Sequence, residues 1–246
     1  MLLRTAAAIG FISGSALLLA GEFWQDKQPS DWTDKDIQRL VTKSPWAKEA
    51  SLSANSDRNG AGMGRRGGMG GMDGRGGMGG PGMGRPRGEE GSGGSRSKPQ
   101  VTVRWDSAAP LREAAAKAHP DDAQAKKVAE WAREFYVVTV TGMPMRQGRG
   151  RGEEQPESDS DRIAQMQDRL KELSVLKLKG SGGSIAPTRV EVSNAPGGRV
   201  ISLLFPRTEA ISLDDQEVDF ETAVGRREIK VKFTLKEMVY RGKLEL

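Results

Sequence analysis

The sequence predicts an α+β fold with a mostly antiparallel sheet, about four helices, and a β-meander in its C-terminal half. Apolar residues recur at helical spacing in several segments before residue 174, which indicates helices. From Val175 onward apolar residues alternate with polar ones between turn residues, which indicates strands. Helices that precede a run of strands are typical of α+β proteins. We expect the tract at 57–100 to be a long disordered insertion rich in Gly, Arg and Met.

The first segment, residues 1–21, has the features of a signal peptide, cleaved or retained as a short anchor. Arg4 supplies the positive start, and an uncharged run follows it. This run is shorter than the about 20 apolar residues that a membrane-spanning helix needs. Glu22 stands where a lipid-modified cysteine would have to be. We expect an exported bacterial protein, periplasmic or extracellular, with no transmembrane span in the mature chain.

Residues 22–56 should form a short helix and a strand. Thr33 is a suitable N-cap for a helix that Pro45 ends. The strand pattern at 47–54 predicts pairing with the alternating segment at 101–105, so the tract would separate two partner strands. Trp24 and Trp32 lie in a stretch without clear periodicity, where we expect less order and rings that a ligand can reach.

The α+β domain at 101–246 should contain three more helices, one central strand and a flexible linker at 146–160. The helices are predicted at 109–118, 121–134 and 162–173, and the central strand at 135–140. Trp131 should be buried. The last helix carries a stripe of Ile163, Met166, Leu170 and Leu173 that we expect to face the core.

The C-terminal strands are predicted at 175–179, 188–193, 200–205, 217–222, 228–235 and 243–246. A two-residue turn at Gly225-Arg226 would oppose Glu221 to Lys230 and Asp219 to Lys232 on the outer face of one hairpin. The acidic run that contains these carboxylates lacks the spacing of a calcium loop. We expect its members to be paired with lysines.

Residue types exclude several kinds of chemistry. The chain has no cysteine and one histidine, His119, so disulfides, thiolate metal sites, cysteine nucleophiles and two-histidine metal centres are excluded. His119 precedes Pro120 at a helix end, where a capping role is typical. The sequence predicts no catalytic or cofactor-binding residue, and it leaves open whether the protein binds a metal ion.

The net charge of +5 belongs to the glycine-rich tract. Its arginines are candidate contacts for a polyanion: Arg58, Arg65, Arg66, Arg75, Arg85 and Arg87. The Arg-Gly repeats resemble the RGG boxes of RNA-binding proteins, but no aromatic residue lies between Trp46 and Trp105. The pattern therefore favours an anionic envelope polymer, an anionic lipid headgroup or another envelope protein over nucleic acid.

Two other interpretations of the tract remain open. Its methionines, Met63, Met69, Met72, Met78 and Met83, and the later pair Met143 and Met145, are soft donors that suit Cu(I). The tract also has the composition of a solvated spacer with no ligand.

Three segments resemble an uncharacterised family of exported bacterial proteins: the SPWA sequence at 44–47, the strand at 103–108 and the ending KFTLKEMVYRGKLEL at 232–246. The resemblance implies export and brings no activity or cofactor with it. We therefore expect an exported, non-enzymatic, envelope-associated binding or structural protein with a cationic loop that contacts polyanions. A hydrolase that uses unassigned carboxylates and a Cu(I)-binding protein are the alternatives.

Overall fold

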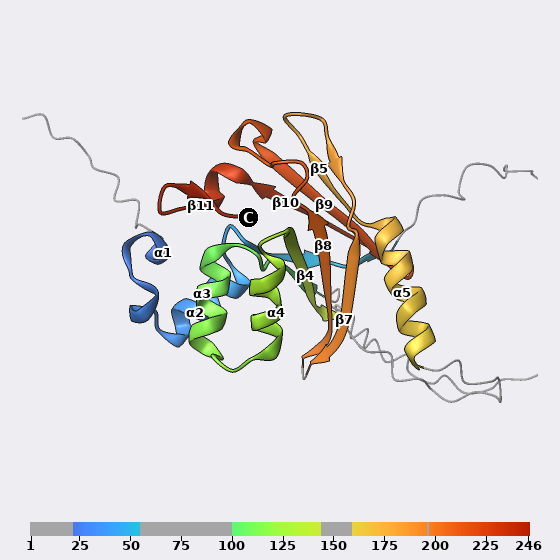
Figure 1. Ribbon diagram of the computed structural model, residues 1–246, viewed down its shortest axis with the longest axis horizontal. Coiled ribbons are helices and arrows are strands. Elements are labelled where there is room, and N and C mark those ends of the chain that lie inside the picture. The colour runs from blue at the N-terminus through green and yellow to red at the C-terminus, as the bar shows by residue number, and fades with distance from the viewer. Residues whose placement is uncertain (1–21, 55–99, 144–158, 196) are drawn as a thin grey trace, which may run out of the picture.

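The computed structural model describes residues 22–54, 100–143, 159–195 and 197–246. Two five-stranded antiparallel sheets pack with their inner faces together, and helices lie on both sides (Figure 1). This confirms the predicted α+β fold with mostly antiparallel strands. The tract at 57–99 and most of the predicted linker lie outside the described residues.

The C-terminal strands are divided between the two sheets. Sheet A has the order β1 (Ala47–Ser51), β3 (Gln100–Trp105), β4 (Phe135–Met143), β8 (Gly198–Pro206), β7 (Arg189–Ala195). Sheet B has the order β2 (Ser53–Ala54), β10 (Arg227–Thr234), β9 (Glu217–Val224), β5 (Val175–Leu178), β6 (Ser184–Ile185). A short hairpin of β11 (Val239–Tyr240) and β12 (Lys243–Leu244) follows.

The described residues contain five α-helices, of which the sequence predicted all except the first. They are α1 (Phe23–Asp26), α2 (Asp34–Thr42), α3 (Ala109–Ala118), α4 (Ala123–Trp131) and α5 (Asp159–Leu173), with 3₁₀ turns at Pro29–Asp31, Leu213–Asp215 and Leu235–Met238. In Figure 1 the first four lie together on one side, and α5 lies at the other side next to β7. Asp159 and Ser160, which we assigned to the linker, begin α5.

The core between the sheets is built on edge-to-face aromatic pairs. The rings of Trp105 in sheet A and Phe233 in sheet B are 5.3 Å apart. Phe205 and Phe220 form a second such pair across the sheets at 6.3 Å. All four side chains are fully buried. Their packing buries large apolar surfaces and fixes how the two sheets face each other.

Strand β4 is buried on both faces, which explains its continuous apolar sequence. Tyr136, Val138 and Val140 belong to the core between the sheets. Val137 and Thr139 point to the other face, where α4 contacts β4, and both are buried too. A strand covered on two sides needs apolar residues at successive positions rather than at alternate ones.

Four aromatic or apolar side chains differ from expectation. Trp24 and Trp32 are core residues, because α1 and the following turn pack their rings inward, so the expectation of accessible rings is wrong. Trp131 is half-buried and stacks with the Arg189 guanidinium. Leu173, at the end of α5, is 49% exposed. The helix ends there, so its last stripe position extends beyond the sheet.

The three segments on which we expected a family resemblance meet in one region of the structure. The indole nitrogen of Trp46 donates to the main-chain oxygen of Glu245 at 2.8 Å, and its ring packs against Tyr240. The Trp105 amide donates to the Trp46 carbonyl at 2.8 Å. Glu245 in turn accepts from the Ala109 amide at the start of α3. These residues tie the C-terminal segment to the helices and sheet A, which is a packing role.

The β9–β10 hairpin has the predicted turn and register. Glu221 opposes Lys230 and Asp219 opposes Lys232 across the pair. The ion pairs, however, form with other partners: Lys232 bonds Glu217 at 3.0 Å and Glu221 accepts from Lys177 of β5 at 2.8 Å. Strand β9 has neighbours on both sides, so its carboxylates meet lysines that the hairpin alone does not reveal.

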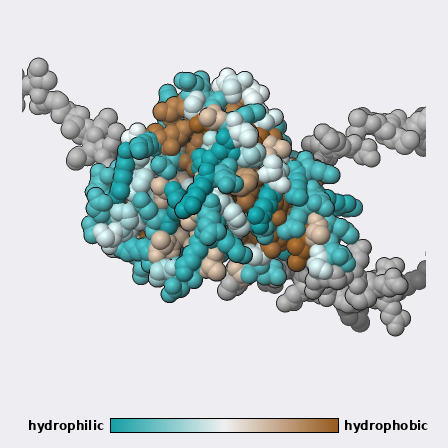
Figure 2. Space-filling model, viewed as in Figure 1, coloured by the Kyte–Doolittle hydropathy of each residue, from teal (hydrophilic) through white to brown (hydrophobic). Residues whose placement is uncertain are grey.

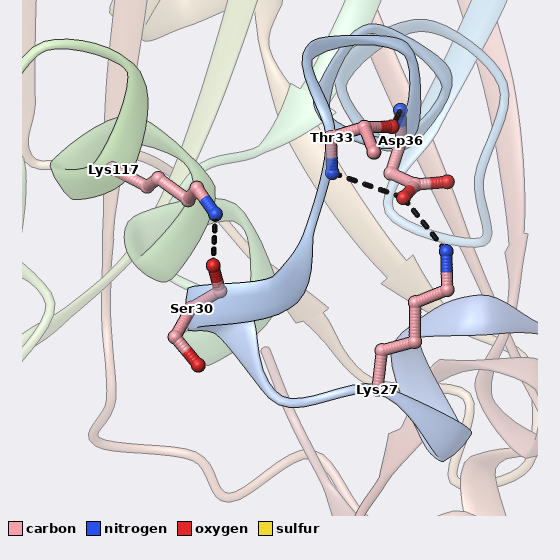
Figure 3. A network of polar contacts seen from close by, with 5 residues as sticks. All are labelled: Lys27, Ser30, Thr33, Asp36 and Lys117. Atoms are coloured by element: carbon pink, nitrogen blue, oxygen red, sulfur yellow. Dashed lines mark hydrogen bonds and ion pairs between the residues drawn. The ribbon is translucent and has the colours of Figure 1, made fainter.

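Helix α2 begins with a capping box. The Asp36 amide donates to the Thr33 hydroxyl at 3.2 Å, and the Thr33 amide donates to the Asp36 carboxylate at 3.0 Å (Figure 3). Lys27 also bonds that carboxylate at 3.0 Å, while Lys117 of α3 donates to the Ser30 carbonyl. This network joins α1, α2 and α3. The hydrogen bonds from Thr33 and Lys27 lower the pKa of Asp36 from 3.8 to about 2.

This pKa shift predicts how stability depends on pH. Because the folded pKa lies below the unfolded one, the Asp36 carboxylate stabilises the fold above about pH 4 and loses this effect as the pH falls through about 2. Asp36→Asn should lower the free energy of unfolding at pH 7, and the difference from wild type should shrink toward pH 2. Urea unfolding at several pH values measures it. Asp34→Asn, in the same helical turn, is the control, and a difference that stays constant from pH 4 to pH 2 would contradict the assignment.

Candidate functional site

The six arginines predicted to contact a polyanion lie in the tract, outside the described residues. The structure does show where the tract joins the body. Ala54, the last residue described before it, pairs with Arg227, and Gln100, the first one after it, pairs with Ser51. Both ends of the tract therefore meet the body at the same end of the two sheets.

A hollow of about 650 Å³ lies at this end of the body. Its described lining residues are Leu52, Met143, Arg199, Val224, Gly225, Arg226 and Arg227. Three of them are arginines and none is acidic. Gly225 has φ +63° and allows the tight turn that brings Arg226 and Arg227 to the rim. The hollow thus combines an apolar floor with a positively charged rim.

Arg199 is placed by a local irregularity of sheet A. The pairing of β4 with β8 shifts register between Val140 and Met143, so that Met143 opposes Arg199. Gly198 lies against this bulge with φ +120°, and a Cβ there would come within 2.6 Å of the Met143 carbonyl oxygen. Only glycine fits this close approach without strain. The bulge and Gly198 together aim Arg199 between the hollow and α5.

The hydrogen bonding of Arg199 is incomplete in the described part of the chain. Its Nη1 donates to the thioether of Met166 on α5 at 3.5 Å, and its Nε is buried without an acceptor. A thioether is a weak acceptor, and a buried N–H without a partner costs free energy. A phosphate or carboxylate oxygen is the acceptor that a guanidinium binds best. This side chain therefore has free capacity for an anion.

A groove of about 430 Å³ lies next to the hollow, between α5 and the β9–β10 turn. The two share Val224 and Gly225. Its other lining residues are Arg162, Gln165, Met166, Arg169, Leu170, Glu172, Leu173 and Ala223. Five arginines and one glutamate line the hollow and groove together. In the view of Figure 2 the surface is mostly hydrophilic, with hydrophobic areas beside α5 and near β11.

None of these five arginines forms an ion pair with a described carboxylate. Other arginines of the body do. Arg104 makes two bonds to Asp106 at 3.0 and 2.9 Å, which raise its pKa, and Arg189 binds Glu191 at 2.5 Å. The hollow and the groove therefore bring together five arginines that have no ion-pair partner among the described carboxylates.

A second groove, near the N-terminal helix, has a different character. Its charged lining residues are Glu22, Lys43, Lys48, Glu49 and Glu237, so both signs are present. Lys48 and Glu237 lie 3.6 Å apart and compensate each other. The buried Ser44 hydroxyl on its wall has no described partner. This groove has no preference for a charged ligand comparable to that of the hollow.

The carboxylates with shifted pKa values are paired rather than poised for proton transfer. Hydrogen bonds from Lys179 and Lys232 lower the pKa of Glu217. Burial of Asp215 raises its pKa, but hydrogen bonds from Ser212 and Ser181 outweigh burial and lower it. Such groups are ionised at neutral pH, whereas a general acid needs a raised pKa. His119 is exposed and lies at the C-cap of α3, as its position before Pro120 predicts.

The methionines considered for Cu(I) lie outside the described residues, except Met143, which is buried at the end of β4. Within the described ranges no group of three or more His, Asp or Glu side chains could hold a metal ion. No helix among them is long and apolar enough to cross a membrane.

Comparison of the chain with protein-family models, with curated proteins and with solved structures found no match. The arginine-lined hollow was not predicted from the sequence. Its members come from the link between β1 and β2, the end of β4, the start of β8 and the β9–β10 turn, and only the neighbouring arginines Arg226 and Arg227 gave a local signal.

The close approach at Gly198 can be tested by mutation. Gly198→Ala should lower the free energy of unfolding by about 1–3 kcal/mol, because the methyl group meets the Met143 carbonyl and the backbone is strained. Gly197→Ala is a matched control, since a Cβ there meets nothing within 4 Å, and should stay within about 0.5 kcal/mol of wild type. Thermal and urea unfolding measure both. Equal effects of the two substitutions would show that the bulge does not constrain this position.

Proposed function

We propose that this protein is an exported, non-enzymatic, envelope-associated binding protein that holds an anionic component of the cell envelope. The observation that carries the proposal is the arginine-lined hollow at the end of the body where the cationic tract joins. Arg227 pairs directly with the last described residue before the tract. The arginines of the hollow therefore lie beside the point where the chain enters the tract, and the arginines of the tract have the same sign.

The chemistry of the hollow suits binding better than catalysis. Arginine stays protonated at all physiological pH values, so it supplies charge and hydrogen bonds but does not exchange protons. The described lining of the hollow contains no carboxylate, histidine, serine or threonine that would act as base or nucleophile. A multivalent anion would gain several charge-assisted hydrogen bonds there.

Export is supported by the signal-like sequence at 1–21 and by the family resemblance. N-terminal sequencing of the protein recovered from the envelope fraction tests it. We expect a product that is found outside the cytoplasm, either cleaved near residue 21 or intact. An intact Met1 on a purely cytosolic product would contradict export.

Binding can be tested with long-chain polyphosphate as the probe and the full chain as the protein. We expect Arg226→Gln combined with Arg227→Gln to weaken binding roughly tenfold, because two exposed cationic contacts are lost. Added salt should weaken wild-type binding and reduce the difference between the proteins. Isothermal titration calorimetry at several salt concentrations measures both effects.

The matched control is Lys127→Gln combined with Arg133→Gln. It removes the same charge from the exposed surface of α4 and the residues that follow it. Arg133 precedes β4, whereas Met143 of the hollow ends the same strand, so the control charges lie at the other end of sheet A. If the control pair weakens binding as much as the Arg226 and Arg227 pair, net charge rather than the hollow determines binding.

A further inference from the structure

The groove beside α5 makes the proposed function more specific. We propose that the hollow and the groove together bind an anionic lipid, with its headgroup on Arg199, Arg226 and Arg227 and its acyl chain along α5. This inference rests on the proposed function, because it names the ligand class of the same site. A lipid also requires an apolar surface for its acyl chain, which a purely polar anion does not.

The first argument is that apolar side chains line both the hollow and the neighbouring groove. Leu52 and Met143 form part of the floor of the hollow, and Val224 lines both spaces. From there Met166, Leu170, Leu173 and Ala223 continue along α5 and β9. A polymer that is charged along its whole length gains nothing from these side chains. An acyl chain gains free energy from each methylene group that it removes from water.

The second argument is the exposure of Leu173. This residue is 49% exposed although it continues the apolar stripe of α5, whereas Leu170, one turn earlier, is fully buried. Leu173 lies on the wall of the groove, and the basic residues Arg162 and Arg169 lie on the same helix wall. Exposed apolar surface flanked by arginines matches an amphiphile with a negative charge.

The third argument is the position of Arg199, at the junction of the two spaces. Its contact with the Met166 thioether reaches the groove, while the side chain itself lines the hollow. Its Nη1 bonds only this weak thioether acceptor, so a phosphate oxygen of a headgroup would be a stronger partner for the guanidinium. The polar and apolar parts of an anionic lipid therefore meet at the boundary between arginines and apolar wall.

Dodecyl phosphate below its micelle concentration is a soluble probe for this arrangement. We expect the full chain to bind it at a single saturable site. Decyl phosphate should bind roughly tenfold more weakly, because two methylene groups are lost. Inorganic phosphate, which lacks the chain, and dodecyltrimethylammonium, which has the same chain with a positive head group, should show no saturable binding. Calorimetry measures all four.

Two variants separate the headgroup from the chain. Leu173→Ser should weaken dodecyl phosphate at least fivefold and leave polyphosphate binding unchanged, since only the lipid uses the groove. Its control is Leu213→Ser, at a leucine that is 45% exposed outside the hollow and groove. Arg199→Gln should weaken both ligands. Leu173 is half-exposed, so its substitution should not prevent folding. It therefore tests the groove even where Arg199→Gln lowers the stability of the protein.

The outcomes distinguish the two proposals. Binding of polyphosphate without dodecyl phosphate, or equal affinity for decyl and dodecyl phosphate, would overturn the lipid inference and leave the proposed function standing. Binding of neither ligand would overturn both. Equal effects of Leu173→Ser and Leu213→Ser would show that the alkyl chain binds outside the groove, and would also overturn the inference.

Discussion

The strand at 47–54 is the constraint on which the rest of the structure depends, because it belongs to both sheets. Ser51 pairs with Gln100 in sheet A, and two residues later Ser53 pairs with Glu228 in sheet B. Only Leu52 separates the two pairings, and its side chain is buried. A slip of one residue would turn side chains to the wrong face of both sheets. This strand thus sets the two sheets relative to each other and lets the aromatic pairs meet between them.

The same constraint determines where charge gathers. Since β2 pairs with the first residues of β10, the β9–β10 turn and its arginines lie beside the end of the strand. The bulge of β4 brings Met143 and Arg199 to that end as well. Elsewhere on the body, several carboxylates have lysine or arginine partners, among them Asp36, Asp106 and Glu217. The arginines without ion-pair partners gather at one end because three strand ends and α5 pack together there.

Local patterns predicted those parts of the fold that local physics controls. The N-cap at Thr33, the turn at Gly225 and the alternation along β9 and β10 each involve residues near in sequence, and all were confirmed. The expected ion partners of Asp219 and Glu221 were wrong because β5 lies on the other side of β9. The burial of Trp24 and Trp32 was underestimated for a similar reason. Their burial depends on contacts with Trp46 and Phe23, which no periodicity within a short segment reveals.

The sequence by itself determined the α+β class, most helices and strands, and the cationic character of the tract. It predicted the pairing of 47–54 with 101–105, of which 47–51 forms that pairing while 53–54 pairs with β10 instead. Only the tertiary structure decided that the strands form two sheets and that Arg199 and Arg226 line one hollow, with Met166 in the groove beside it. The physical reason is the distance along the sequence between the residues that interact. Helical stripes, caps and turns depend on neighbours within a few residues. A hollow depends on which distant segments pack together, and that follows from the burial of the whole core.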